Sequence, residues 1–168
     1  MKIIIIGAGE VGYHVASRLS HEDKDVVVID PDADALRRVS DNIDAQTLTG
    51  SGSSPKVLEE AGIKETEILL AVTDSDEVNL MACLMTDLLS PSTKKLARIR
   101  NGDYDAYHDA FREHAPRIDT IINPEIEVVK TIDERDKAVF DSLRAVIKEQ
   151  AAAKEPGLLY KKIKKDKS

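Results

Sequence analysis

Short runs of apolar residues alternate with longer amphipathic stretches over most of the chain. The apolar runs are nearly continuous in Ile, Val and Leu, which is typical of strands buried on both faces of a sheet. We expect strands over residues 2–6, 26–30, 45–49, 67–73, 95–100 and 120–122. Helical spacing between these runs predicts helices over residues 11–20, 33–41, 55–61, 77–89 and 104–114. This alternation predicts an α/β fold with a parallel sheet and right-handed crossovers, the Rossmann-type doubly wound pattern with six strands.

The pattern changes after Asn123-Pro124, where no further strand is indicated. Apolar residues then recur at helical spacing, at Ile126, Val129, Ile132, Val139, Leu143 and Val146. They predict a long C-terminal helix over residues 125–150, either unbroken or bent at the charged cluster 133–137. An unbroken helix is longer than one sheet can cover, so its apolar stripe is expected to meet a second copy of the chain. If the helix bends, the stripe can instead fold back on its own sheet.

The first strand runs directly into Gly7-Ala8-Gly9-Glu10-Val11-Gly12. This is the G-x-G-x-x-G pattern at a strand-to-helix turn, where Gly7 permits the turn, Gly9 admits a pyrophosphate and Gly12 lets the helix approach the strand. The free N–H groups and the positive helix end then face the phosphates. Asp30 lies eighteen residues beyond Gly12, at the end of the second strand. Its carboxylate is placed to bind both ribose hydroxyls, which indicates an adenine dinucleotide such as NAD.

Polar residues follow the other strands at the same predicted edge of the sheet. Ser51 and Gly52 lie in the loop after the third strand, near the expected adenine. The polar run Thr73-Asp74-Ser75-Asp76 follows the fourth strand, near the expected phosphates. Arg98 and Arg100 lie two residues apart on one face of the fifth strand. They are available to a phosphate or to an interface, and the alternative is that one of them pairs with Asp30 or Glu125.

Composition and charge narrow the class of protein. The 168 residues carry a net charge of −7, with 42% hydrophobic and 33% charged residues, as in a soluble globular protein. Residues 161–168 contain five lysines and one aspartate, so the other 160 residues carry about −11. Such an acidic body argues against nucleic acid as a partner. The single cysteine, Cys83, suits a reducing cytoplasm, and neither a signal peptide nor a membrane span is expected.

No constellation of catalytic or metal-ligating residues is visible. The four histidines show no metal-binding spacing. A Tyr-x-x-x-Lys pair, Tyr160 with Lys164, lies in the lysine-rich tail rather than near the predicted sheet. We therefore expect a binding domain rather than an enzyme, and the alternative is an NAD-dependent oxidoreductase domain.

Six motifs occur in the order GAGEVGYHVASRL, VVVID, GSGSSPKVLEEAGI, AVTDSDEVNLMAC, ARIR and IINPE. With them the chain resembles the RCK or KTN family, the nucleotide-binding regulatory domains of bacterial potassium transport. The resemblance implies a regulator that binds NAD(H), with ATP and ADP as competing nucleotides, and that forms homodimers and higher rings. It also implies docking on a membrane potassium-translocating subunit of the Trk or Ktr type, and so a cytoplasmic location at the inner face of the membrane.

The same resemblance assigns roles to individual residues. The glycine loop, with Glu10 and Val11, faces the phosphates, Asp30 the ribose, and Ser51 and Gly52 the adenine. Thr73, Arg98 and Arg100 face the second and terminal phosphates, and Glu125 the dimer face. Relatives that sense the γ-phosphate of ATP often carry arginine where this chain has Glu10, which favours NAD here.

The expected organisation has three parts. Residues 1–123 form the nucleotide-binding domain, 124–155 a crossover or dimerisation helix, and 156–168 a disordered basic tail. Family members usually continue into a second small ligand-binding domain, for which residues 131–168 show no pattern.

Overall fold

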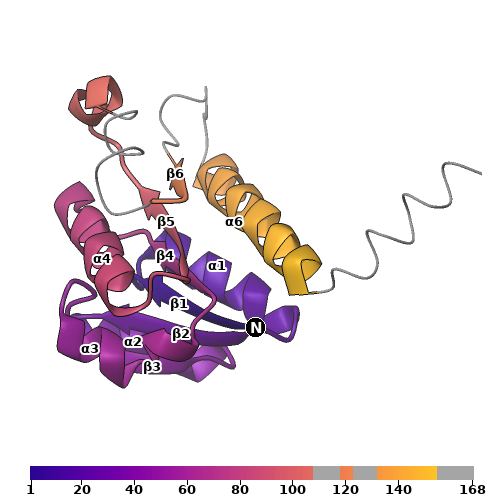
Figure 1. Ribbon diagram of the computed structural model, residues 1–168. Coiled ribbons are helices and arrows are strands. Elements are labelled where there is room, and N and C mark those ends of the chain that lie inside the picture. Colours follow the sequence, from indigo (N-terminus) through magenta and orange to yellow (C-terminus); the bar gives the residue numbers. More distant parts are fainter. Residues whose placement is uncertain (108–117, 123–131, 155–168) are drawn as a thin grey trace, which may run out of the picture.

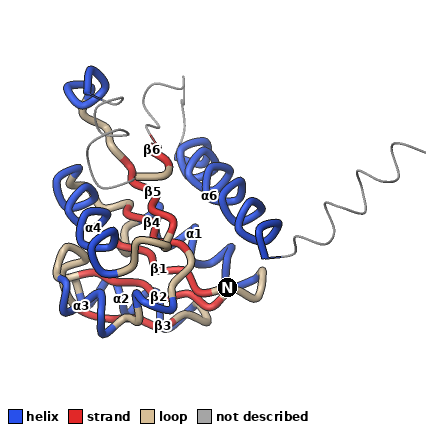
Figure 2. The backbone as a smooth tube through the Cα atoms, viewed as in Figure 1, coloured by secondary structure: helices blue, strands red, loops and turns tan. Residues whose placement is uncertain are grey.

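The computed structural model describes residues 1–107, 118–122 and 132–154 of the chain. Six parallel strands form one sheet in these ranges, and helices cover both of its faces (Figures 1 and 2). The strands are β1 (Lys2–Ile6), β2 (Asp25–Asp30), β3 (Gln46–Thr49), β4 (Ile68–Ala71), β5 (Lys94–Arg98) and β6 (Thr120–Ile122). The helices are α1 (Glu10–His21), α2 (Ala33–Asn42), α3 (Pro55–Glu60), α4 (Asp76–Leu89) and α6 (Ile132–Lys154), with 3-10 turns η1 (Ile63–Glu65) and η2 (Gly102–Tyr107).

The strands lie in the order β3-β2-β1-β4-β5-β6, and each neighbouring pair is parallel. The chain therefore runs outward from β1 to β3, returns to the other side of β1 with β4, and runs outward again to β6. This order confirms the predicted doubly wound sheet. The connection that follows β1 leads toward β2, whereas the connection that follows β4 leads the opposite way, toward β5. Such a reversal of direction opens a ligand crevice at the carboxyl ends of these strands.

The unbroken isoleucine run of β1 reflects burial on both faces of the sheet. Ile3 and Ile5 pack with residues of α1, α2 and α6, whereas Ile4 and Ile6 pack with residues of α3, η1 and α4. All four side chains are at most 1% exposed. The most hydrophobic segment of the sequence therefore becomes the centre of a three-layer domain and fixes the start of the glycine loop.

The C-terminal helix packs on its own sheet. α6 runs through residues 133–137 without the interruption that the charged cluster had suggested (Figure 1). Val139 and Leu143 are fully buried and Val146 is 7% exposed. These three side chains share one core cluster with apolar residues of α1 and β1.

The expectation that this stripe is left for a second subunit is therefore wrong for Val139, Leu143 and Val146. α1 offers an apolar face of its own, which a pattern read along α6 alone does not reveal. Ile126 and Val129, at the start of the predicted stripe, lie outside the described residues, as does Glu125.

Several predicted boundaries differ from those in the structure, and those after β4 and β5 affect the candidate site. β4 ends at Ala71 and β5 ends at Arg98, so Thr73 and Arg100 lie in the loops that follow these strands. The 3-10 turn η2 occupies the beginning of the helix predicted over residues 104–114, and residues 108–114 lie outside the described ranges. Loops thus begin earlier than predicted at the edge of the sheet where the ligand crevice is expected.

Among the described residues, none of the helices combines the length and the apolar character that crossing a membrane requires. The same ranges contain no group of three or more His, Cys, Asp or Glu side chains arranged to hold a metal ion.

Candidate functional site

Two adjoining pockets lie at the carboxyl ends of β1, β2 and β4. The first, of about 330 Å³, lies against the glycine loop and the start of α1. The second, of about 430 Å³, lies against the loop after β3. Asp30, Thr73 and Asp74 line both pockets, so the two form one crevice at the point where the strand order reverses. Each has the size of a small-molecule site.

The glycine loop is shaped by two glycines that no other residue can replace without strain. Gly7 has a φ of +108°, and its N–H donates to the Ile29 carbonyl at 2.8 Å. A Cβ on Gly12 would lie 1.8 Å from the Gly7 carbonyl oxygen, so only glycine lets α1 start so close to the turn. A Cβ on Gly9, in contrast, would meet no atom within 4 Å, so Gly9 borders open space in the first pocket.

The N-terminal turn of α1 faces this open space. Gly9, Glu10 and Val11 all line the first pocket, and the first N–H groups of an α-helix have no partner within the helix. These donors, with the positive end of the helix dipole, form a site that favours an anion.

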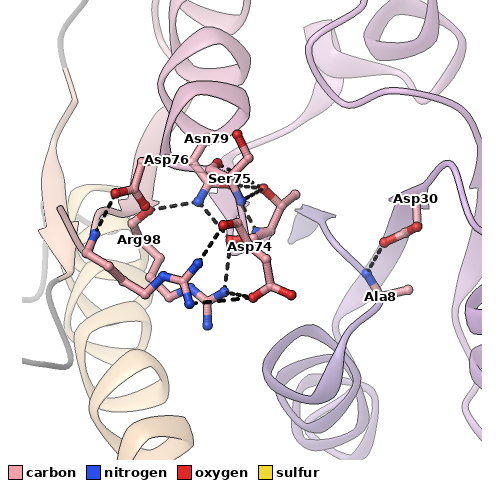
Figure 3. Close-up of polar contacts among 9 residues, drawn as sticks. Ala8, Asp30, Asp74, Ser75, Asp76, Asn79 and Arg98 are labelled. Carbon is pink, nitrogen blue, oxygen red and sulfur yellow. Dashed lines mark hydrogen bonds and ion pairs between the residues drawn. The ribbon is translucent and has the colours of Figure 1, made fainter.

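Asp30 ties the end of β2 to the glycine loop. Its Oδ2 accepts a hydrogen bond of 2.7 Å from the Ala8 N–H (Figure 3). Its Oδ1 accepts one of 2.8 Å from the Asp32 N–H. Each carboxylate oxygen has a second lone pair, so hydroxyl donors in the crevice can still bind. The sequence predicted a ribose contact for Asp30 but not this bond to the loop.

Glu10 is neutralised by a cation from the neighbouring crossover. Its carboxylate accepts a hydrogen bond of 2.6 Å from Arg38 Nη1. Arg38 in turn lies over the Tyr13 ring, 4.1 Å from the ring centroid. The hydrogen bond and the positive charge of Arg38 lower the pKa of Glu10. The positive charge of Arg38 therefore partly compensates the negative charge that Glu10 brings to the glycine loop.

Ser51 and Gly52 lie in the wall of the second pocket. A Cβ on Gly52 would lie 2.0 Å from Cγ2 of Ile6, so glycine lets this loop pack onto the end of β1. Ser51 Oγ lies 2.8 Å from Ser53 Oγ, and the side chain is exposed. Ser51 is thus available to a ligand on the side of the crevice away from α1.

A buried amide holds the loop after β4. Asn79, which is fully buried in α4, accepts hydrogen bonds of 3.0 Å from the Thr73 N–H and 2.7 Å from the Thr73 hydroxyl. Its own amide donates to the carbonyls of Thr73 at 3.1 Å and Arg98 at 2.8 Å. Asn79 therefore joins the carboxyl ends of β4 and β5 and fixes Thr73 between the two pockets.

The two predicted arginines converge on the carboxylate of Asp74 and not on that of Asp30, the pairing that the sequence had left open. Arg98 Nη2 donates to Asp74 Oδ1 at 2.8 Å and to the Thr73 carbonyl at 2.8 Å (Figure 3). Arg100 Nη1 lies 3.7 Å from the same Asp74 oxygen. Burial and the positive charge of Arg100 lower the pKa of Arg98, and the carboxylate of Asp74 opposes this shift. Arg98 lines the first pocket, whereas Arg100 is not among its lining residues.

Comparison with known proteins assigns the chain to a family. The TrkA-N domain family matches residues 3–124. The chain belongs to this family. The match confirms the resemblance to potassium-transport regulatory domains that the sequence motifs indicated.

Curated relatives of this TrkA-N domain carry the name Trk system potassium uptake protein TrkA. The protein from Halomonas elongata is 43% identical over 125 residues, which cover 74% of this chain and 27% of the relative. The protein from Vibrio alginolyticus is 41% identical over 136 residues, which cover 80% of this chain and 30% of the relative. The chain thus spans less than a third of these relatives' length.

Solved structures agree on the fold of the TrkA-N domain. The TrkA-N domain of inner membrane protein ybaL from Escherichia coli has a TM-score of 0.65 at 16% identity, over 76% of this chain and 90% of that one. The GsuK channel bound to NAD has a TM-score of 0.63 at 18% identity, over 74% of this chain and 22% of that one. At these identities the likeness concerns the fold alone.

The sequence placed Asp74 near the expected phosphates but not against the two arginines. Asn79 and Arg38 were missed as parts of the site. Asp74 and Asn79 belong to the polar run around the start of α4, and that run was the available signal. Arg38 carried no signal, because its pairing with Glu10 joins residues 28 positions apart.

Proposed function

We propose that this TrkA-N domain binds an adenine nucleotide in the crevice and serves as a regulatory part of a potassium uptake system. The observation that carries the proposal is the pairing of Asp30 with the glycine loop. Together they place a hydroxyl acceptor and a set of free N–H donors at the edge of one crevice.

Each chemical group of NAD(H), ADP or ATP has a matching set of residues in the crevice. The turn at Gly9 and the start of α1 would hold the pyrophosphate, and Asp30 the ribose hydroxyls. Ser51 and Gly52 would border the adenine in the second pocket. Thr73 and Arg98 would face the second phosphate, with Arg100 beyond it. NADP is disfavoured, because its 2′-phosphate would meet the carboxylates of Asp30 and Asp32.

Regulation rather than catalysis is proposed because the TrkA relatives are named for potassium uptake. Different nucleotides would make different contacts with the glycine loop, the loop after β3 and Arg98, which come from separate crossovers. Only such differences in affinity can shift a population of assemblies. The domain would thus act in a homodimer or ring at the cytoplasmic face of a membrane potassium-translocating subunit.

A thermal-unfolding panel with NAD, NADH, ADP, ATP and NADP tests nucleotide binding. A ligand that binds only the folded chain raises Tm, and the rise grows with the ratio of ligand concentration to Kd. We expect NAD(H), ADP and ATP to raise Tm and NADP to raise it less. No rise with any of these nucleotides would contradict the proposal.

The structure also offers a variant that blocks the site and spares the fold. Gly9→Asp fits sterically, because a Cβ at Gly9 meets no atom within 4 Å and its φ of −64° suits any residue. Its carboxylate would occupy the path of the phosphates. We expect Gly9→Asp to keep the unliganded Tm and lose the nucleotide-induced rise, whereas Gly9→Ala, which adds a methyl group without charge, should lose less of it. A rise retained in Gly9→Asp would place the nucleotide elsewhere.

A further inference from the structure

The carboxylate of Asp74 occupies the arginine end of the crevice. It lies 2.8 Å from Arg98 Nη2 and 3.7 Å from Arg100 Nη1. The exposure of the partners is very unequal: the Asp74 side chain is 92% exposed, Arg98 10% and Arg100 35%. Figure 3 shows Asp74 at the guanidinium groups, on the side of the site that faces Asp30 and Ala8.

The two charges of this pair are held with different strength. The Arg98 side chain is buried, and its guanidinium also donates a hydrogen bond to the Thr73 carbonyl. Moving the guanidinium into water would break this bond and disturb the packing around it. A buried guanidinium that loses its counter-anion is strongly destabilised. Asp74, in contrast, is almost fully hydrated already, so turning it away from Arg98 costs little solvation. The arginine is fixed, and its anion is exchangeable.

A ligand phosphate is the natural replacement for this carboxylate. Phosphate and carboxylate oxygens accept the same charge-assisted hydrogen bonds from a guanidinium. Asp74 and Arg98 line the first pocket together with Gly9 and Glu10. A phosphate chain anchored at the glycine loop therefore extends toward the position that Asp74 holds.

We propose that Asp74 is a specificity-determining residue, an internal stand-in for a ligand phosphate that the ligand must displace from Arg98. The proposal rests on the proposed nucleotide function and names what decides between ligands. A nucleotide whose phosphates reach Arg98 exchanges one anion for another. A ligand without a phosphate there, such as adenosine, leaves the Asp74–Arg98 pair intact and gains nothing from the arginines.

Titration calorimetry with ADP and adenosine tests this exchange. Asp74→Asn removes the competing charge and keeps the size of the side chain. We expect it to bind ADP about tenfold more tightly than the wild-type chain does, the size of one charge-assisted hydrogen bond. Adenosine affinity should change less than twofold. Equal ADP affinity in the two proteins, or an equal gain for adenosine, would overturn the proposal.

The matched control is Asp41→Asn, which makes the same change in net charge. Asp41 is exposed near the C-terminal end of α2, whose opposite end borders the crevice. We expect Asp41→Asn to change ADP affinity less than twofold. A tenfold gain in this control would show a general charge effect and overturn the proposal.

Inorganic pyrophosphate separates this proposal from the nucleotide function. At a fixed pyrophosphate concentration we expect a larger rise in Tm for Asp74→Asn than for the wild-type chain, whether or not adenine is recognised. If the wild-type chain binds ADP but Asp74→Asn gains neither ADP affinity nor pyrophosphate stabilisation, the Asp74 proposal fails and the nucleotide function stands. If no nucleotide binds, the nucleotide function fails, and an absent pyrophosphate difference refutes the role of Asp74 as well.

Discussion

Asp30 Oδ2 accepts a hydrogen bond of 2.7 Å from the backbone N–H of Ala8, across 22 positions of sequence. The residue that the sequence offers as a ribose ligand therefore also fixes the loop that would hold the phosphates. One carboxylate links two parts of the same candidate site, so the shape of the loop and the contact to a ribose are coupled.

Replacing Asp30 with alanine is expected to affect both binding and stability. Asp30→Ala removes the proposed acceptor of two ribose hydroxyls, so NADH should bind at least about tenfold more weakly in calorimetry. The buried Ala8 N–H also loses its acceptor, which should lower the free energy of unfolding by about 1–3 kcal/mol while the chain stays folded. Asp41→Ala, at an exposed position, should change neither quantity. Unchanged NADH affinity would remove Asp30 from the site.

The sequence predicts the features of this domain that depend on residues close together along the chain. Six strands, their parallel arrangement and the glycine loop follow from apolar runs and from spacing within fewer than twenty residues. The pairing of Arg98 with Asp74 joins residues 24 positions apart and depends on where two loops end. Propensity does not fix such contacts, and only the register of β4 against β5 brings them together.

The C-terminal helix shows the same limit. Val139, Leu143 and Val146 of the predicted stripe are buried, but the choice between a partner subunit and the chain's own sheet depends on the apolar face of α1. That face belongs to residues more than a hundred positions earlier, among them Val15 and Leu19. Periodicity along one helix says that a partner exists and does not identify it.

Arg100→Gln is expected to weaken ATP more than adenosine. Arg100 shares Asp74 with Arg98, and in the proposed site its charge would act on a distal phosphate and not on the nucleoside. Calorimetry should show about a fivefold loss for ATP, consistent with a partly exposed ion pair. The control is Arg37→Gln, because Arg37 pairs with Asp34 on its own helix, 3.3 Å away. Equal losses for ATP and adenosine would assign Arg100 to packing or to an interface.

Leu143→Ala is expected to destabilise the folded chain. The side chain is fully buried against α1 and the sheet, and such truncations cost about 2–5 kcal/mol. Urea unfolding should show this loss, and Lys148→Ala, at an exposed position of the same helix, should show none. Sedimentation equilibrium gives the second readout, since we still expect residues 1–168 to form a dimer or larger assembly. If Leu143→Ala dissociates this assembly but leaves the free energy of unfolding unchanged, the apolar residues of α6 form a subunit interface after all.

Cys83 is expected to be unreactive in the folded chain. It is fully buried, and burial raises its pKa from 9.0 to about 12. The thiol therefore stays protonated at pH 8, and a thiol reagent should label it only after unfolding in guanidinium chloride. Between about pH 9 and 12 only the unfolded chain ionises this thiol, so stability should fall by about 1.4 kcal/mol per pH unit from this group. Rapid labelling of the folded chain at pH 8 would contradict this burial.

Nucleotide binding in this crevice can be followed by an NMR titration of the uniformly ¹⁵N-labelled chain with NADH. We expect the largest amide shifts at Ala8, Gly9 and Val11 in the glycine loop, with further shifts at Ser51 and Thr73. These residues border the two pockets or lie in the loop between them. Spectra that do not change, or shifts confined to α6 and to the amino ends of the strands, would contradict nucleotide binding in this crevice.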